Sequence, residues 1–387
     1  MVSGGNEFIY NSPLLQDRLY VNDGAGNFSK DESALPEMLT SGSRVSSADY
    51  DNDGDLDLFV GGRLVPGNYP KPADSYILEN VSSNGKPKFL DVTDKVAPDL
   101  RKLGLATSAI WSDYNSDGEV DLIVVGEWMP ITVFRNRNGS FKNVSDDLGL
   151  DDSTGWWFSI QSGDFDADGD VDYIAGNLGL NYKYKAEGDE TFDVYFNDFD
   201  KNATNDIVLS YFNDGEKFPV RGRECSSQQI PVIKVKYKNY ESFANATLVD
   251  IYTERDLEKS LHYQVKSFAS VYIENKEGRF EIHDLPNLAQ LSSINQIIVK
   301  DFNKDSNLDV IVAGNLHSSE VETPRNDASN GLLLSGDGNG SFEAVPSRVS
   351  GLYAPGDVKD VAEIKISNQD YLIMAKNNDF IQFVKTN

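Results

Sequence analysis

The amino-acid sequence predicts an all-β protein, a β-propeller of four-stranded blades that carries a small helical insertion. Three observations predict this fold. A nine-residue acidic loop occurs five times, each loop lies between two apolar strands, and most of these strand pairs are followed by a hairpin that ends in a phenylalanine. Four-stranded units that recur every few tens of residues are typical of propeller blades arranged around an axis.

The first acidic loop, Asp49 to Asp57, places a carboxylate on alternate residues. Carboxylates this close repel one another, so a compact loop of them indicates a hard cation bound by oxygen atoms, and calcium fits this chemistry. Gly54 allows the sharp turn, and the seventh place contributes a backbone carbonyl. The twelfth place is Val60 rather than the bidentate glutamate of an EF-hand, and the chain continues as a strand. The sequence therefore predicts a calcium loop between two strands.

The same frame returns at residues 113–121, 164–172, 198–206 and 301–309. Every copy has an oxygen-bearing side chain at places one, three, five and nine. The last two copies replace the turn glycine with Ala203 or Ser306 and carry fewer charges, so we expect weaker binding there. The predicted ligands of about five calcium ions are Asp49, Asp51, Asp53, Asp55, Asp57, Asp113, Asn115, Asp117, Glu119, Asp121, Asp164, Asp166, Asp168, Asp170, Asp172, Asp198, Asp200, Asn202, Thr204, Asp206, Asp301, Asn303, Asp305, Asn307 and Asp309.

These loops resemble the FG-GAP and VCBS repeats of calcium-binding β-propellers, such as the head of integrin α subunits. A wider set of motifs resembles the bacterial relatives of cartilage acidic protein, and this resemblance covers nearly the whole chain. Those relatives often carry an ASPIC/UnbV-type segment, which is not found here. The resemblance implies a propeller and a calcium site. Its motifs are Asp-Arg-Leu-Tyr (17–20), Gly-Glu-Trp-Met-Pro (126–130), Gly-Trp-Trp (155–157) and Gly-Asn-Leu-Gly-Leu-Asn (176–181).

The repeats divide the chain, residues 1–387, into one propeller of seven blades, with six or eight as alternatives. The expected blades are 1–40, which is incomplete, then 41–98, 99–152, 153–190, 191–290, 291–350 and 351–387. The loops at Asp164 and Asp198 are closely spaced, so the alternative of six blades assigns both to one enlarged blade. Between 216 and 261 the near-helical spacing of apolar residues predicts the helical insertion. The hairpin phenylalanines are expected to pack between neighbouring sheets, because aromatic burial dominates core energetics.

The formal net charge of −27 at pH 7 argues against nucleic acid or anionic membranes as partners. No stretch approaches the roughly 18 apolar residues of a membrane span, and residues 1–20 lack the pattern of a signal peptide. A single cysteine, Cys225, excludes an internal disulfide and leaves calcium to stabilise the fold. Loops of this type suit roughly millimolar extracellular calcium, so we expect an extracellular, cell-surface or periplasmic location. The match between 2–5 and 59–62 predicts that the chain begins inside a repeat of a longer protein.

Polar groups beside aromatic rings are expected around the channel mouth opposite the calcium loops. Such a ring suits the recognition of a glycan or a protein. In the alternative interpretation, Trp and Arg at blade junctions only close the rim. The predicted ligand-binding residues are Arg63, Glu127, Trp128, Trp156, Asn177, Asn315 and His317.

The leading functional hypothesis is a non-catalytic, calcium-stabilised binding or adhesion module for a protein or glycan. The alternative is a polysaccharide-active enzyme, a lyase or hydrolase, that uses the same face. No set of residues in the sequence forms a recognised acid, base or nucleophile motif, and the histidines His262, His283 and His317 lie in none.

Overall fold

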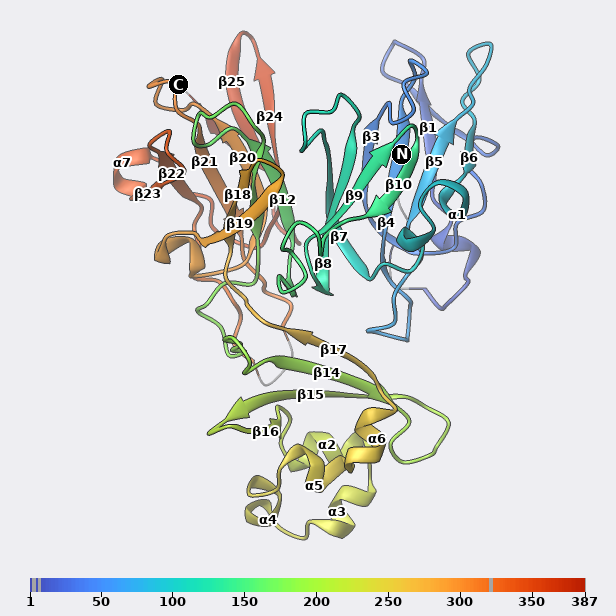
Figure 1. The fold of residues 1–387 in the computed structure, drawn as a ribbon, viewed down its shortest axis with the longest axis vertical. Coiled ribbons are helices and arrows are strands. Elements are labelled where there is room, and N and C mark those ends of the chain that lie inside the picture. Colours follow the sequence, from blue (N-terminus) through green and yellow to red (C-terminus); the bar gives the residue numbers. More distant parts are fainter. Residues whose placement is uncertain (2–4, 6–7, 320–322, 387) are drawn as a thin grey trace.

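The computed structural model (Figure 1) describes residues 1, 5, 8–319 and 323–386. The expected match of residues 2–5 to a strand exit falls almost entirely outside these residues. The described chain is mostly β-structure, and all its strand pairs are antiparallel. None of its helices is long and apolar enough to span a membrane.

Six sheets follow one another along the chain in the upper body of Figure 1. The first pairs β1 (Leu19–Asn22) with β2 (Phe28–Asp31). The second has the order β3 (Ser41–Ala48), β4 (Asp57–Leu64), β5 (Tyr76–Asn80) and β6 (Phe89–Asp91). In the third, β8 (Asp121–Met129) pairs with β7 (Leu105–Ser112), β9 (Thr132–Arg137) and β11 (Gly155–Trp156), and β10 (Ser140–Asn143) pairs with β9.

In the remaining three sheets of the body, the strands lie side by side in the order in which they occur along the chain. The fourth is β12 (Ser159–Gly163), β13 (Asp172–Gly176), β18 (Val271–Lys276) and β19 (Arg279–Asp284). The fifth is β20 (Ile294–Lys300), β21 (Asp309–Gly314), β22 (Leu332–Gly336) and β23 (Phe342–Val345). The sixth has three strands, β24 (Val358–Ile366), β25 (Gln369–Lys376) and β26 (Gln382–Lys385). Among the described residues, no strand pairing joins this last sheet to the first.

Neighbouring sheets pack face to face through apolar clusters. Tyr50 and Phe141 contact each other between the second and third sheets, with ring centroids 5.4 Å apart. Buried amides add polar links, because Asn136 Nδ2 donates to the Tyr50 carbonyl (2.7 Å) and Asn275 Nδ2 donates to the Tyr114 carbonyl (2.8 Å). The first hairpin differs from the expectation, since Phe28 is 65% exposed on a sheet of only two strands.

A separate sheet projects below the body in Figure 1, with the order β16 (Glu216–Pro219), β15 (Asp206–Asn213), β14 (Phe192–Asn197) and β17 (Leu261–Val265). We call it the inserted sheet, because the chain leaves the body after β13 and returns at β18, and these two strands are hydrogen-bonded neighbours. The expected boundary at residue 190 therefore falls inside an excursion from one sheet. Residues 153–190 form no complete sheet of their own, because β12 and β13 share a sheet with β18 and β19. The acidic loop at 198–206 joins β14 to β15 of the inserted sheet.

One face of the inserted sheet packs against the body, and the other packs against a group of short helices. Phe192 and Val194 point toward the body, whereas Tyr195 and Val208 pack against short helices. These helices are α2 (Arg223–Gln229), α3 (Val232–Lys236), α4 (Tyr240–Ala244), α5 (Leu248–Tyr252) and α6 (Glu254–Glu258). Two further short helices, α1 (Thr93–Val96) and α7 (Ser347–Ser350), and 3-10 turns at 13–15, 98–100 and 287–290 lie in the connections of the body.

Candidate functional site

The five acidic loops have the same backbone shape. The fourth and sixth places adopt a left-handed conformation in every copy, with φ near +60° at the fourth place, as in Asn52 (61°), and larger values at the glycines, as in Gly54 (97°). Ala203 (69°) and Ser306 (77°) adopt the same conformation without being glycine. The two degenerate copies therefore fold like the others, and Ala203 and Ser306 carry the strain of a left-handed backbone.

Hydrogen bonds within each loop hold this shape. Asp49 Oδ1 accepts from the backbone N–H of Asp53 (3.1 Å), and Asp49 Oδ2 accepts from the N–H of Gly54 (3.0 Å). Asp113, Asp198 and Asp301 accept the equivalent pair of bonds. The frame is local, because every donor lies within five residues of its acceptor.

The closing aspartate of each loop is buried, and in the four loops of the body it accepts a bond from the third strand of the sheet. Asp57 and Asp121 each accept a 2.7 Å bond from a backbone N–H of the third strand, and Asp172 accepts one of 2.8 Å. Burial raises the pKa of Asp57, Asp172 and Asp206 to about 6, and that of Asp121 to about 7. A buried carboxylate with this tendency to hold a proton is a strong ligand for a cation at neutral pH.

The oxygen atoms of these loops fit calcium. In the loops at 49, 164 and 198, three acidic oxygens lie within 4.8 Å of one another. Asp55 and Asp170, both at the seventh place, each have a buried Oδ1 without a hydrogen-bond partner. An unpaired buried carboxylate oxygen is unfavourable, and a hard cation in an all-oxygen site would satisfy it. The seventh place thus offers a side-chain oxygen, as predicted for Asp55 and Asp170, in addition to its backbone carbonyl.

The structure places the predicted ligand-binding residues at the sheet ends opposite the acidic loops. Five of them lie together. Arg63 Nη2 donates to Glu127 Oε1, and Trp128 and Trp156 form an edge-to-face pair with ring centroids 5.1 Å apart. The backbone N–H of Trp156 donates to Asn177 Oδ1 (3.1 Å).

Tyr69, which the sequence analysis did not single out, belongs to this group. Its hydroxyl donates to Glu127 Oε2 (3.2 Å) and accepts from Trp128 Nε1 (2.5 Å). It follows β4 in a segment rich in proline, and the sequence offered no signal beyond that composition. We call Arg63, Tyr69, Glu127, Trp128 and Trp156 the lower-face cluster.

Most of the predicted ring is buried rather than open to a channel. Trp128 is 3% exposed and stacks on Phe192 of the inserted sheet, with ring centroids 5.8 Å apart. Asn177 and Asn315 are buried and donate their amides to backbone carbonyls, as in the 2.8 Å bonds of Asn315 Nδ2 to Ser329 and Gly356. The inserted sheet therefore covers Trp128 and Trp156, which both pack against Phe192. Arg63 Nη1, Trp156 Nε1 and His317 Nε2 are nevertheless buried without a hydrogen-bond partner.

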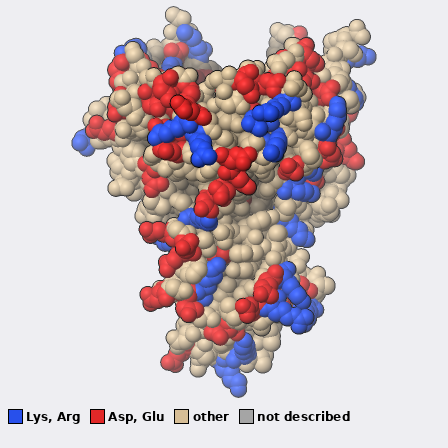
Figure 2. All heavy atoms as spheres, in the orientation of Figure 1, with Lys and Arg blue, Asp and Glu red and all other residues tan. Residues whose placement is uncertain are grey.

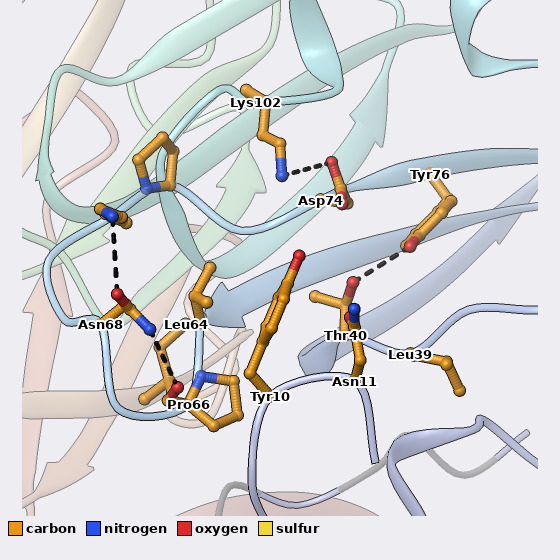
Figure 3. Close-up of a pocket in the computed structure, with 13 residues that line it drawn as sticks. Tyr10, Asn11, Leu39, Thr40, Leu64, Pro66, Asn68, Asp74, Tyr76 and Lys102 are labelled. Atoms are coloured by element: carbon orange, nitrogen blue, oxygen red, sulfur yellow. Dashed lines mark hydrogen bonds and ion pairs between the residues drawn. The ribbon is translucent and has the colours of Figure 1, made fainter. Parts of the chain in front are cut away.

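A cavity of about 570 Å³ lies beside the lower-face cluster, where the chain leaves β4 after Arg63 (Figure 3). We call it the Tyr10 cavity, because the ring of Tyr10 stands between Leu64 and Thr40 in this view. Its walls come from four separate parts of the sequence, so no local pattern predicted it.

A model of FG-GAP-like repeats matches residues 4–60 and 113–175. The chain contains FG-GAP-like repeats. The matched stretches include the loops at 49, 113 and 164, which keep the turn glycine and are called FG-GAP loops below. The loops at 198 and 301 share their backbone frame but lie outside the matched stretches.

Two solved structures have low similarity to this chain. A lectin of Agrocybe aegerita that specifically recognises non-reducing terminal N-acetylglucosamine has 13% sequence identity and a TM-score of 0.34, over 95% of this chain and 88% of the lectin. The V. cholerae biofilm matrix protein Bap1 has 12% identity and a TM-score of 0.31, over 92% of this chain and 70% of Bap1. Likeness at this level supports neither a shared fold nor a shared ligand. No curated protein matches the chain.

Without metal, the protein is expected to become more stable as the pH falls from 8 to 6. The folded pKa values of Asp57 and Asp121, about 6 and about 7, exceed the unfolded value of about 3.9. The folded state therefore binds more protons in this window, and the resulting stability is lost as the pH rises through the folded pKa values. Thermal melts in metal-free buffer at pH 6 and pH 8 test this, with calcium-loaded protein as the control. A lower melting temperature at pH 6 than at pH 8 in metal-free buffer would contradict this prediction.

The change Ala203→Gly is expected to stabilise the protein by roughly 1 kcal/mol, because glycine removes left-handed strain. Calcium occupancy of the loop at 198 should rise with it. The reciprocal variant is Gly54→Ala, where an added Cβ would meet no atom within 4 Å, so only the backbone conformation is changed. That variant should lose roughly 1 kcal/mol. Denaturant unfolding measures the free energy of unfolding of both variants. If neither variant shifts the midpoint, the left-handed conformation carries no measurable strain.

Proposed function

We propose that the protein is a calcium-stabilised extracellular module that binds a glycan or a protein partner without catalysing a reaction. The buried, unpaired carboxylate oxygens of Asp55 and Asp170 carry the calcium part of this proposal. Calcium, when bound, supplies positive charge that neutralises the clustered carboxylates and links the first two strands of a sheet. The ligands would be the oxygen-bearing side chains of the five loops, and the loops with glycine would bind more tightly.

We also propose that the six sheets of the body are blades of one propeller spanning residues 1–387, with the helices at 216–261 inserted in it. Face-to-face packing of consecutive sheets supports this arrangement. The motifs shared with bacterial relatives of cartilage acidic protein support a closer kinship with that group.

The ligand is proposed to bind at the lower face, opposite the acidic loops. Arg63 Nη1 and Trp156 Nε1 are buried N–H donors without a partner, and His317 Nε2 is a buried donor or acceptor without one. A ligand that reached these atoms would pair with them, because an unpaired buried polar group is costly. Glu127, Trp128, Asn177 and Asn315 would hold these groups in place through the contacts described above. Acidic side chains are spread over the upper body in Figure 2, with basic ones among them, which disfavours a nucleic acid as the partner.

Glycan-array binding, protein capture and polysaccharide turnover, all measured on one calcium-loaded preparation, test the proposed function. Saturable binding without product release is expected, and measurable cleavage would overturn the non-catalytic assignment. Trp156→Phe keeps the packed ring but removes Nε1, and it should weaken binding. The matched control is Trp111→Phe, because Trp111 Nε1 is also buried without a partner. Trp111 stacks on Tyr50 of the first acidic loop and therefore lies away from the lower face. Equal binding by both variants would exclude Trp156 from the site.

A further inference from the structure

The Tyr10 cavity has the size and composition of a small-molecule site. Its volume of about 570 Å³ lies within the range of about 300 to 1,000 Å³ typical of ligand pockets. Its lining combines aromatic rings with amide, hydroxyl and charged groups rather than being uniformly apolar. Such a mixture suits a ligand that has one flat apolar face and several polar substituents.

The charges in the cavity do not balance. Lys102 Nζ forms an ion pair with Asp74 Oδ1 at 2.8 Å, which uses the one carboxylate of the lining. Lys71 is exposed and forms no ion pair with any described residue. Its Nζ lies 3.5 Å from Asn68 Oδ1 and 5.5 Å from the centroid of the Phe196 ring. The cavity therefore has one positive charge that no carboxylate of the described residues compensates.

The neutral lining groups suit a sugar ring. Tyr10 is 58% exposed, so its ring offers a flat surface on which the C–H face of a pyranose can pack. The amides of Asn11 and Asn68 can both donate to and accept from hydroxyl groups. Thr40 shares a 3.0 Å hydrogen bond with Tyr76, which fixes the hydroxyl pair at the cavity wall (Figure 3).

We propose that the Tyr10 cavity binds a saccharide that carries a carboxylate, that is, a uronic acid residue of an acidic glycan. Lys71 pairs with the carboxylate, Tyr10 packs on the pyranose ring, and Asn11 and Asn68 bond to its hydroxyls. Lys71 offers a single point charge, because no arginine is among the described lining residues to provide a forked pair of donors. This assignment rests on the proposed glycan-binding function and names the class of glycan.

Calorimetric titration of the calcium-loaded protein with oligosaccharides of galacturonic, glucuronic and mannuronic acid tests the assignment. Each acid is compared with its methyl ester, which keeps the sugar but removes the charge. At least one acid should bind. Its ester should bind more weakly by about tenfold or more, as expected for the loss of one charged hydrogen bond. Equal affinity for acid and ester would overturn the role of Lys71.

Variants locate the site. Lys71→Gln and Tyr10→Ala should each weaken binding of the acid by about tenfold, and Lys71→Arg should keep most of it. The matched control is Lys86→Gln, an exposed lysine outside the cavity, which should bind like the parent protein. If neutral glycans bind and no uronic acid does, the inference is wrong and the proposed function stands. If no glycan and no protein binds, both are wrong.

Discussion

Removal of calcium is expected to lower the melting temperature by roughly 10 °C or more. A site kept at a hundredfold excess of calcium over its dissociation constant contributes about 2.7 kcal/mol, and the three FG-GAP loops contribute independently. Without the ion, carboxylates such as Asp57 and Asp121 stay buried near other negative charges. Differential scanning calorimetry with calcium and with excess chelator measures the effect. An unchanged melting temperature at zero metal content would contradict it.

A single-site variant separates metal binding from general destabilisation. Asp166→Asn weakens one FG-GAP loop, so the calcium-dependent gain in melting temperature should shrink. The melting temperature without metal should not fall, because the change removes one of several mutually repelling charges. Asp146→Asn, an exposed aspartate outside the loops, should change neither value. A fall in the metal-free value for Asp166→Asn would indicate a structural role unrelated to calcium.

The acidic loops could be predicted from the sequence because their structure is local. Each nine-residue frame contains both the carboxylates and the N–H groups they accept from, as in the bonds of Asp49 to Asp53 and Gly54. The left-handed conformation of Ala203 and Ser306 follows from their alignment with the turn glycines. Only the contact of the closing aspartate with the third strand depends on distant residues.

The inserted sheet could not be predicted, because strand pairing over a long excursion has no local signature. β13 and β18 are separated by almost a hundred residues, yet they are neighbours in one sheet. The sequence alone therefore assigns the acidic loop at 198–206 to a blade, because such a loop requires only two antiparallel strands and these also occur in the inserted sheet. The same excursion explains why part of the predicted ligand ring is buried, because Trp128 and Trp156 pack against Phe192 of β14. The Tyr10 cavity escaped prediction because its walls come from distant segments.

Trp128→Ala is expected to cost about 3 to 5 kcal/mol, the range for a buried large aromatic residue. Trp128 is 3% exposed and stacks on Phe192, and its Nε1 bonds to Tyr69. Its φ of +61° is unfavourable for a bulky residue, so the packing must also hold a strained backbone. Because these contacts join the body to the inserted sheet, the loss should be largest at their junction.

Hydrogen exchange separates loss of this junction from global unfolding after Trp128→Ala. Amides of β14 and β17 should lose protection while those of β20 and β21, in a sheet that Trp128 does not contact, keep theirs. Trp128→Phe retains a ring against Phe192 but loses the bond to Tyr69 and part of the indole volume, so its cost should lie below that of Trp128→Ala. If Trp128→Ala leaves β14 and β17 as protected as in the parent protein, the lower-face cluster does not hold the inserted sheet in place.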